Sequence, residues 1–409
     1  MKIRSITCFV DPGWPVNDLL LQRAGRFITT ARQVFEIAGF EVQTGRLATT
    51  PFPQFLDELS ASRLIELAQG METIGKDSGF DYISLGSALP DNPDSYLIIP
   101  EALAETQSVF FGGLMTLPGG GISLQAVHLC AEVIARTATI SPDGFANLRF
   151  AALANVPPGS PFFPASYHAG EPPAFALALQ AADLAVEAFT TADSINQAQH
   201  ALVEAMQDNA AVLERISTVL EEEQGIRFGG IDFSLAPFPE HELSLGTALE
   251  RLGIPAVGLH GSLAAAAILT EAMDRARFPR TGFNGLMLPL LEDAALAQRA
   301  AEGFLSVKDL LLYSAVCGTG LDTVPLPGDT IAEELFPVLL DLACLAQRLN
   351  KPLTARLMPL PGKYAGDATN FDFPYFANSR VIALASNPLH GLFPGGETFY
   401  LQPRDRIQK

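Results

Sequence analysis

The sequence predicts an α/β protein, and two observations support this. First, segments with strand-like and helix-like patterns of apolar residues alternate from one end of the chain to the other, which is typical of α/β architectures. Second, the loops between these segments are rich in proline and glycine. The composition agrees, because 48% of the 409 residues are hydrophobic and only 17% are charged. A chain of this length can bury on the order of 75% of its unfolded surface.

The N-terminal part begins with alternating apolar and polar residues, as in a half-buried strand. Helical periodicity follows and ends at a glycine, a common residue at helix ends. In chain order we expect a strand at 3–10, a helix at 19–38, a strand at 40–44, a helix at 61–69 and a short buried strand at 82–85.

The rest of the chain contains longer helical patterns separated by short apolar strands. We expect helices at 123–138, 174–190, 194–223 and 331–349, and strands at 149–153, 256–259, 286–288 and 354–359. No low-complexity linker divides the sequence. We therefore expect one large α/β domain over residues 1–409. Whether its N-terminal part forms a separate subdomain is an open question.

Two short segments resemble each other and indicate weakly repeated halves. Gly230-Ile231-Asp232 and Gly320-Leu321-Asp322 each open a stretch that ends in prolines and is followed by a helical pattern. A strand, a Pro/Gly loop and a helix form the repeating unit of barrels and wound sheets. In such folds functional groups gather at the loops beyond the carboxyl ends of the strands.

Charge and cysteine content restrict the partners. The net charge is −19 and no basic run occurs, which argues against nucleic acid. The four cysteines form no CxxC spacing, as expected for reduced thiols in the cytoplasm. No long apolar run resembles a signal peptide or a membrane span. We expect a cytoplasmic protein with a small-molecule ligand and no membrane partner, and a homo-oligomer remains open.

The first candidate site is the polar stretch from Cys317 to Asn378. Arg356 lies in an apolar strand pattern, where an arginine usually pairs with a carboxylate or holds an anion. We expect Arg356 and Lys363 to bind substrate. Asp322, Asp329 and Asp367 are candidate ligands for Mg²⁺, Mn²⁺ or Ca²⁺, although they could equally form an ion-pair network.

Three of these residues have further interpretations. Asp322 is also a candidate acid–base residue, since a buried carboxylate needs a partner or a ligand. Asp329 could instead cap the helix at 331–349. Cys317 stands beside glycines and is either a catalytic nucleophile or a buried structural thiol.

The second candidate site is the loop that follows the strand at 149–153. It contains Asn155, a candidate substrate-binding residue, and His168, a candidate acid–base residue that could instead bond only to the backbone. His260 follows the strand at 256–259 in a similar setting and is a further candidate acid–base residue. Asp232 is a candidate substrate-binding residue that would face the same cavity. The glycine-rich turn at 118–123 lacks the spacing of a P-loop or a dinucleotide fingerprint, so no nucleotide cofactor is indicated.

These motifs resemble one prokaryotic family in order along nearly the whole chain. The segments at 1–7, 100–106, 230–237, 260–261 and 320–330 resemble the family numbered seven hundred and eleven among the domains of unknown function. The resemblance implies a fold similar to the pyruvate formate-lyase class of glycyl-radical enzymes, a ten-stranded α/β barrel of two five-stranded halves. Residues 395–400 depart from the radical-glycine pattern, so the resemblance does not imply radical chemistry, and it implies no established reaction.

The sequence thus supports an uncharacterised protein with two open hypotheses. The first is an enzyme that acts on a small anionic metabolite in a barrel cavity, with or without a divalent metal. The second is a non-catalytic binding or sensor protein on a fold derived from an enzyme. Convergence of Asp322, Arg356 and Asp367 in one cavity is the geometric test of the proposed site.

Overall fold

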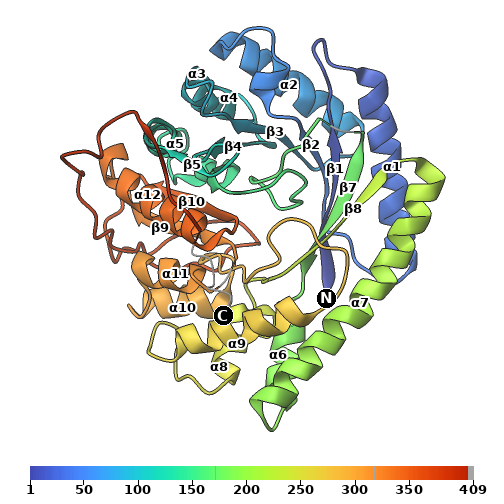
Figure 1. The fold of residues 1–409 in the computed structure, drawn as a ribbon, viewed down its shortest axis with the longest axis vertical. Coiled ribbons are helices and arrows are strands. Elements are labelled where there is room, and N and C mark those ends of the chain that lie inside the picture. The colour runs from blue at the N-terminus through green and yellow to red at the C-terminus, as the bar shows by residue number, and fades with distance from the viewer. Residues whose placement is uncertain (171, 317, 404–409) are drawn as a thin grey trace.

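The computed structural model describes residues 1–170, 172–316 and 318–403 (Figure 1). It is a mixed α/β structure built on a nine-stranded sheet with the strand order β8-β7-β1-β2-β3-β4-β6-β10-β9. A further small sheet pairs β11 with β5. The strands are β1 (Lys2–Val10), β2 (Gly45–Thr49), β3 (Tyr82–Ala88), β4 (Val109–Leu114), β5 (Gly121–Ser123), β6 (Phe150–Ala154), β7 (Ala174–Gln180), β8 (Arg227–Ala236), β9 (Gly320–Pro327), β10 (Leu353–Leu360) and β11 (Thr398–Tyr400).

Most neighbouring strands of the large sheet are parallel. β1, β2, β3, β4 and β6 run in one direction. On one side the parallel pair β7 and β8 runs antiparallel to β1, and on the other side the parallel pair β10 and β9 runs antiparallel to β6. β8 and β9 are therefore the two edge strands of this sheet.

The helices lie around the outside of the strands (Figure 1). The helices at 18–37, 61–77, 124–137, 195–224 and 332–349 contact strands of the sheet and bury apolar residues, as expected for amphipathic helices on a buried sheet. The helices are α1 (Asp18–Ile37), α2 (Ala61–Asp77), α3 (Asp94–Leu97), α4 (Ile99–Ala104), α5 (Leu124–Thr137), α6 (Ala182–Thr191), α7 (Ile195–Gln224), α8 (Leu245–Arg251), α9 (Ser262–Arg275), α10 (Ala294–Ala301), α11 (Val307–Ser314) and α12 (Ala332–Leu349), with 3₁₀ turns at Phe52–Gln54, Phe145–Arg149 and His241–Leu243.

The segment 279–292 contacts both edge strands. Ile231 of β8 donates its backbone N–H to Pro279, and Leu290 donates to Asp322 of β9, at 2.8 and 2.9 Å. Isolated parallel bridges join Ile231 to Arg280 and Pro289 to Asp322. The start of this segment therefore lies against β8, at one edge of the sheet, and its end lies against β9, at the other edge.

Residues 155–170 form a long loop that lies against the inner face of the sheet, the face turned away from the surrounding helices (Figure 1). Ser5 and Thr7 of β1 donate hydroxyl hydrogen bonds to the carbonyl of Pro161, and Ser84 of β3 donates to that of Ser166 at 2.7 Å. All three serine and threonine side chains are buried. Their bonding supplies partners for loop carbonyls that would otherwise be buried without one.

The predicted alternation of strands and helices is confirmed, but several segments differ. Residues 174–190 are a strand followed by a helix, because β7 is buried on both faces and so lacks the period of two that marks a half-buried strand. The second strand begins at Gly45 rather than at residue 40. Residues 256–259 and 286–288 form no named strand, and β4 was not predicted.

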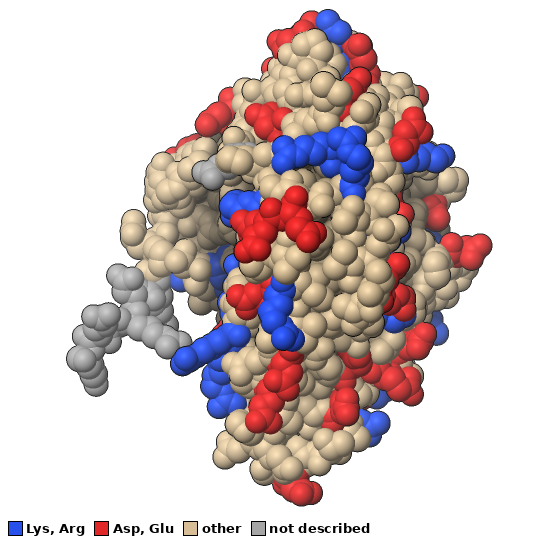
Figure 2. Space-filling model, turned by 90° about the vertical axis from the view of Figure 1, so that its right-hand side faces the viewer, with Lys and Arg blue, Asp and Glu red and all other residues tan. Residues whose placement is uncertain are grey.

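The surface carries both signs of charge. On the face shown in Figure 2, acidic side chains are spread over the molecule with Lys and Arg side chains between them. No helix in the described ranges is both long enough and apolar enough to cross a bilayer.

Candidate functional site

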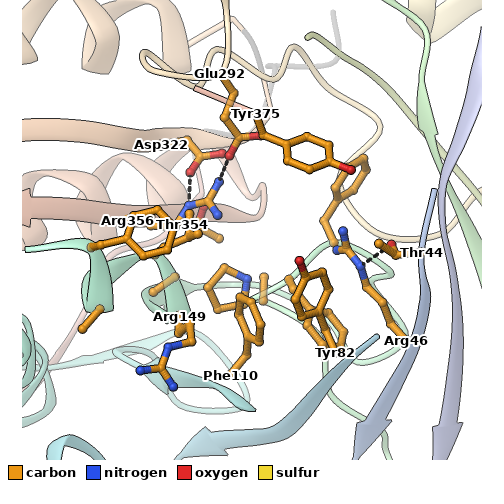
Figure 3. A pocket seen from close by; sticks show the side chains of 18 of the residues that line it. Thr44, Arg46, Tyr82, Phe110, Arg149, Glu292, Asp322, Thr354, Arg356 and Tyr375 are labelled. Atoms are coloured by element: carbon orange, nitrogen blue, oxygen red, sulfur yellow. Dashed lines mark hydrogen bonds and ion pairs between the residues drawn. The ribbon is translucent and has the colours of Figure 1, made fainter. Parts of the chain in front are cut away.

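A pocket of about 380 Å³ opens on the inner face of the sheet. Arg4, Arg46, Tyr82 and Phe110 line it from the first two or three residues of β1, β2, β3 and β4. β9 and β10 contribute Asp322 and Arg356 from the opposite side (Figure 3). The pocket therefore lies at the amino ends of β1 to β4, whereas the fold class led us to expect it at the loops beyond their carboxyl ends.

Strand registers explain why these side chains share one face. Arg46 lies opposite Thr7 on one neighbouring strand and opposite Tyr82 on the other. Directly opposed residues point to the same face of a sheet. A register shift between Ile3 and Ser5 marks a bulge at Arg4, and bulges turn a side chain away from the ordinary alternation. A similar shift beside Asp322 accompanies its approach to Arg356.

Arg46 is a cation that lines the pocket and, among the described residues, forms one side-chain hydrogen bond, to a hydroxyl group. Its side chain is buried, and its Nε donates to Thr44 Oγ1 at 3.0 Å. Its guanidinium lies 5.7 Å from the ring centre of Tyr82 and 5.1 Å from that of Phe163. No described aspartate or glutamate forms an ion pair with it. Burial lowers its pKa to about 10, so it remains a cation at neutral pH.

Four charged residues form a chain on the opposite side of the pocket. Arg356 donates from Nε to Asp322 at 2.5 Å and from Nη2 to Glu292 at 2.7 Å. Arg4 forms an ion pair with the other carboxylate oxygen of Glu292. Two cations and two carboxylates therefore balance on this side, and both oxygens of Glu292 are engaged. Arg4 Nη1 is buried and has no hydrogen-bond partner among the described residues.

Asp322 is bound through one oxygen only. Its Oδ1 accepts from Arg356, and no described residue donates a hydrogen bond to Oδ2. Burial raises the pKa of this carboxyl group above its ordinary value, Arg356 opposes the rise and Glu292 adds to it. The pKa of Arg356 is raised, because Asp322 and Glu292 outweigh the lowering effect of burial. Asp322 thus combines an oxygen without a described donor with a pKa raised above its ordinary value, two properties typical of acid–base residues.

Arg149 borders the pocket but has a different role. Its guanidinium donates to the carbonyls of Leu103 and Thr106 at 2.7 and 2.8 Å. In Figure 3 it points away from the side chains that face the cavity. Burial lowers its pKa to about 10. Arg149 therefore holds the chain before β4 in place and is not available to a ligand.

Aromatic rings form much of the remaining wall. Phe110 contacts two rings edge to face, those of Tyr82 and Phe163, and each pair has 5.3 Å between the ring centres. Phe145 and Phe373 form a second edge-to-face pair at 5.1 Å. These contacts fix the rings, since each packs against another in a preferred geometry.

Only some of the residues predicted for the first candidate site lie in the pocket. The structure brings Asp322 and Arg356 together there. Lys363 donates to the carbonyl of Ala368, Asp367 accepts from the backbone N–H of Tyr364, and Asp329 is exposed. None of these three lines the pocket, so the expected convergence of Asp322, Arg356 and Asp367 does not occur. Cys317 lies outside the described residues.

The predicted metal ligands Asp322, Asp329 and Asp367 are likewise not brought together. Within residues 1–170, 172–316 and 318–403, no group of three or more His, Cys, Asp or Glu side chains is arranged to hold a metal ion. The carboxylates that do meet, Glu292 and Asp322, are bridged by Arg356. Of the three predicted aspartates, only Asp322 belongs to an ion-pair network, with Arg356, Glu292 and Arg4.

The second candidate site is also dispersed. His168 is buried beside Phe9 and borders a separate cavity of about 180 Å³. His260 is exposed. Asn155 accepts a hydrogen bond from Gln347. Asp232 is fully buried and accepts from Ser234 and from the backbone of Phe283 and Asn284. None of these four lines the main pocket.

Four residues that line the pocket were not predicted from the sequence: Arg4, Arg46, Tyr82 and Glu292. A signal was present for Arg46, because the strand Gly45-Arg46-Leu47-Ala48 contains a single charge among apolar residues. The same signal singled out Arg356. Glu292 stands after an apolar run that forms no strand, so its approach to Arg356 could only come from the three-dimensional structure.

The chain is similar to known proteins over most of its length. Residues 1–378 match the family described as Uncharacterised ACR (DUF711). A UPF0210 protein of Pyrobaculum arsenaticum is 32% identical over 369 residues, which cover 86% of this chain and 81% of that protein. A UPF0210 protein of Syntrophobacter fumaroxidans is 30% identical over 394 residues, or 91% of this chain and 86% of the relative. The chain therefore belongs to the DUF711 (UPF0210) family, whose function is uncharacterised.

Proposed function

We propose that this protein is an enzyme that binds a small anion on Arg46 and transfers a proton to or from it through Asp322. The observation that carries the proposal is the guanidinium of Arg46, which is buried in a pocket and has no described carboxylate partner. Leaving a buried charge unpaired is unfavourable. An anionic ligand would supply the missing partner, and a guanidinium can bind a carboxylate or phosphate through two parallel hydrogen bonds.

The fixed position of Arg46 supports this role. Thr44 holds Nε, and the rings of Tyr82 and Phe163 flank the guanidinium. The two terminal nitrogens are then left for a ligand. A preorganised site loses little entropy when it binds, which favours affinity for a small molecule. The pocket volume of about 380 Å³ is within the range of small-molecule sites.

Asp322 supports catalysis rather than binding alone. Its free oxygen and raised pKa suit it to accept or donate a proton, whereas Glu292 is fully engaged by Arg4 and Arg356. Arg356 and Glu292 act as positioning residues, because they fix the plane of the Asp322 carboxyl group. General acid–base catalysis of this kind contributes about 10²- to 10⁴-fold in rate.

We also propose that the sheet closes into a ten-position barrel, with segment 279–292 in the tenth position. Its backbone contacts to both edge strands support this arrangement. The five parallel strands β1, β2, β3, β4 and β6 would form one half. The parallel pairs β7–β8 and β9–β10, which run opposite to these five strands, and the segment would form the other half, as the family resemblance implies.

The test compares anion binding to the wild-type protein and to Arg46→Gln. Thermal shift and isothermal titration with small carboxylates and with inorganic phosphate should show at least one saturable ligand for the wild type. Arg46→Gln should lose at least about 100-fold in affinity, since charge-assisted bidentate bonds contribute about 3 kcal/mol. Arg136→Gln, a change at an exposed ion pair with Glu101, is the control. Anion binding that survives Arg46→Gln would refute the proposal.

Catalysis is tested separately once a ligand is found. Incubation in D₂O should exchange a proton of the ligand or convert it, and Asp322→Asn should slow this by about 10²-fold or more. A ligand that binds to Arg46 and is recovered unchanged and without deuterium would instead favour a binding or sensor protein.

A further inference from the structure

We infer that the ligand is an aromatic monocarboxylate that carries a hydrogen-bond donor, such as a hydroxyl or amino group, on the side away from its carboxylate. This inference rests on the proposed function, because it takes Arg46 as the anion-binding residue. It adds the charge, the shape and the second polar group of the ligand. Each of these follows from a different part of the pocket.

Arg149 is bonded to backbone carbonyls and points away from the cavity (Figure 3). The charge balance of the remaining side chains indicates a single negative charge on the ligand. Arg4 and Arg356 are paired with Glu292 and Asp322, so the charges on that side cancel. Arg46 is left without a carboxylate partner among the described residues, and one anionic group would neutralise it. A second carboxylate on the ligand would approach the free oxygen of Asp322, where like charges repel each other strongly in a buried site.

The rings indicate a flat apolar body. Next to Arg46 the pocket wall consists of Tyr82, Phe110 and Phe163, which already contact each other edge to face. Phe145 and Phe373 form another part of the wall. A planar ring between such walls can make the offset or edge-to-face contacts that aromatic pairs prefer. A saturated ring of the same size would bury a similar area without these contacts.

Asp322 indicates the donor. Figure 3 shows Arg46 and Tyr82 on one side of the pocket, with Asp322, Glu292 and Arg356 on the other. A ligand anchored by its carboxylate on Arg46 therefore extends toward Asp322. Its far end meets an oxygen that has no described donor, and leaving such an acceptor unpaired is costly. A hydroxyl or amino group at that end would supply the hydrogen bond.

A matched set of four probes tests the three features separately. Benzoate is the parent compound, cyclohexanecarboxylate replaces the flat ring, terephthalate adds a second carboxylate opposite the first, and 4-hydroxybenzoate places a donor there. Binding is measured by isothermal titration and by protein-observed NMR. For probes of this size we expect dissociation constants of about 1 mM or lower.

The expected order is 4-hydroxybenzoate tightest, then benzoate, then cyclohexanecarboxylate, with terephthalate weakest. We expect about a fivefold advantage of benzoate over the saturated ring. The hydroxyl should add about fivefold, and terephthalate should bind at least about tenfold more weakly than benzoate. Phe110→Leu should reduce the preference for benzoate over the saturated ring, and Asp322→Asn should restore binding of terephthalate toward that of benzoate.

The outcomes separate this inference from the proposed function. Equal affinity for benzoate and cyclohexanecarboxylate, or tighter binding of terephthalate, would overturn the inference while leaving Arg46-dependent anion binding intact. Binding of inorganic phosphate but of none of the four carboxylates would also overturn it. If no anion binds at all, both the inference and the proposed function are refuted. If Phe110→Leu fails to fold, the affinities of the four probes for the wild-type protein still decide the question, and Phe163→Leu gives a second variant.

Discussion

Asp232 on β8 and Asp322 on β9 occupy corresponding places in two similar segments, yet the chain uses them differently. Each follows a glycine with positive φ, 120° at Gly230 and 99° at Gly320, and each lies on an edge strand that contacts segment 279–292. The oxygens of Asp232 are consumed by Ser234, Phe283 and Asn284. Asp322 keeps one oxygen free toward the pocket.

The difference shows that a shared motif fixes a backbone geometry rather than a function. A Cβ at Gly320 would lie 2.2 Å from the carbonyl oxygen of Thr354 and one at Gly230 would meet the backbone of Pro279 and Arg280 at 3.0 Å. In both places glycine permits close approach of a neighbouring chain. What the aspartate then contacts depends on that neighbour: backbone N–H groups for Asp232, and the side chain of Arg356 for Asp322.

The largest predicted effect is on stability at Asp232. Asp232→Ala removes the acceptor of three hydrogen bonds and leaves two N–H groups of partly buried residues without this partner. We expect a loss of about 3 to 4 kcal/mol in the free energy of unfolding. Urea denaturation followed by circular dichroism measures this. A loss below about 1 kcal/mol would mean that Asp232 does not hold segment 279–292 in place.

The second prediction concerns pH. Burial raises the pKa of Asp232 to about 6 from an ordinary value of 3.8. The folded state therefore holds this proton more tightly than the unfolded state does. Its contribution to stability is full below about pH 4 and is lost as the pH rises to 6, by at most about 3 kcal/mol.

Asp232→Asn isolates this contribution. Asp293 and Asp322 also have raised pKa values, so the wild-type curve contains several groups. The difference between wild type and Asp232→Asn in urea denaturation at pH 4, 5 and 6 should favour the wild type most at pH 4. Parallel curves for the two proteins would contradict the assignment.

A smaller effect is expected at Thr44. Thr44→Val keeps the shape of the side chain and removes the hydroxyl that accepts from Arg46 Nε. The guanidinium would be less firmly oriented, and we expect binding of benzoate to weaken about fivefold, or 1 kcal/mol. Thr354→Val, at another residue that lines the pocket, is the matched control. Equal losses in both variants would point to a general disturbance of the pocket.

The smallest change is predicted for the stability of Asp322→Asn. The amide oxygen can still accept from Arg356, which also keeps its bond to Glu292. Burial already disfavours the charged carboxylate. We expect the free energy of unfolding to change by less than about 1 kcal/mol, because the hydrogen bond to Arg356 is kept. A loss as large as that of Asp232→Ala would remove the contrast between the two aspartates.

The predictable part of the fold and site follows from patterns that are local in sequence. Periodicity located β1, α1, α7 and α12, and a charge in an apolar strand located Arg356. Residues near glycines, such as Lys363 and Asp367, attracted the same attention but lie on the surface. Strand order, the bulge at Arg4 and the position of Glu292 depend on contacts between distant segments, which no local pattern contains.

The anchoring of loop 155–170 has a consequence for which of its side chains can be substituted. Ser5, Thr7 and Ser84 donate hydrogen bonds to backbone carbonyl groups of the loop. These acceptors do not depend on which side chains the loop carries. Phe162, Phe163 and Ala165 project into the pocket from this stretch. These side chains can therefore be substituted while the backbone carbonyls keep their hydrogen bonds. Such substitutions would change the shape of the pocket without a change in the sheet or in Arg46.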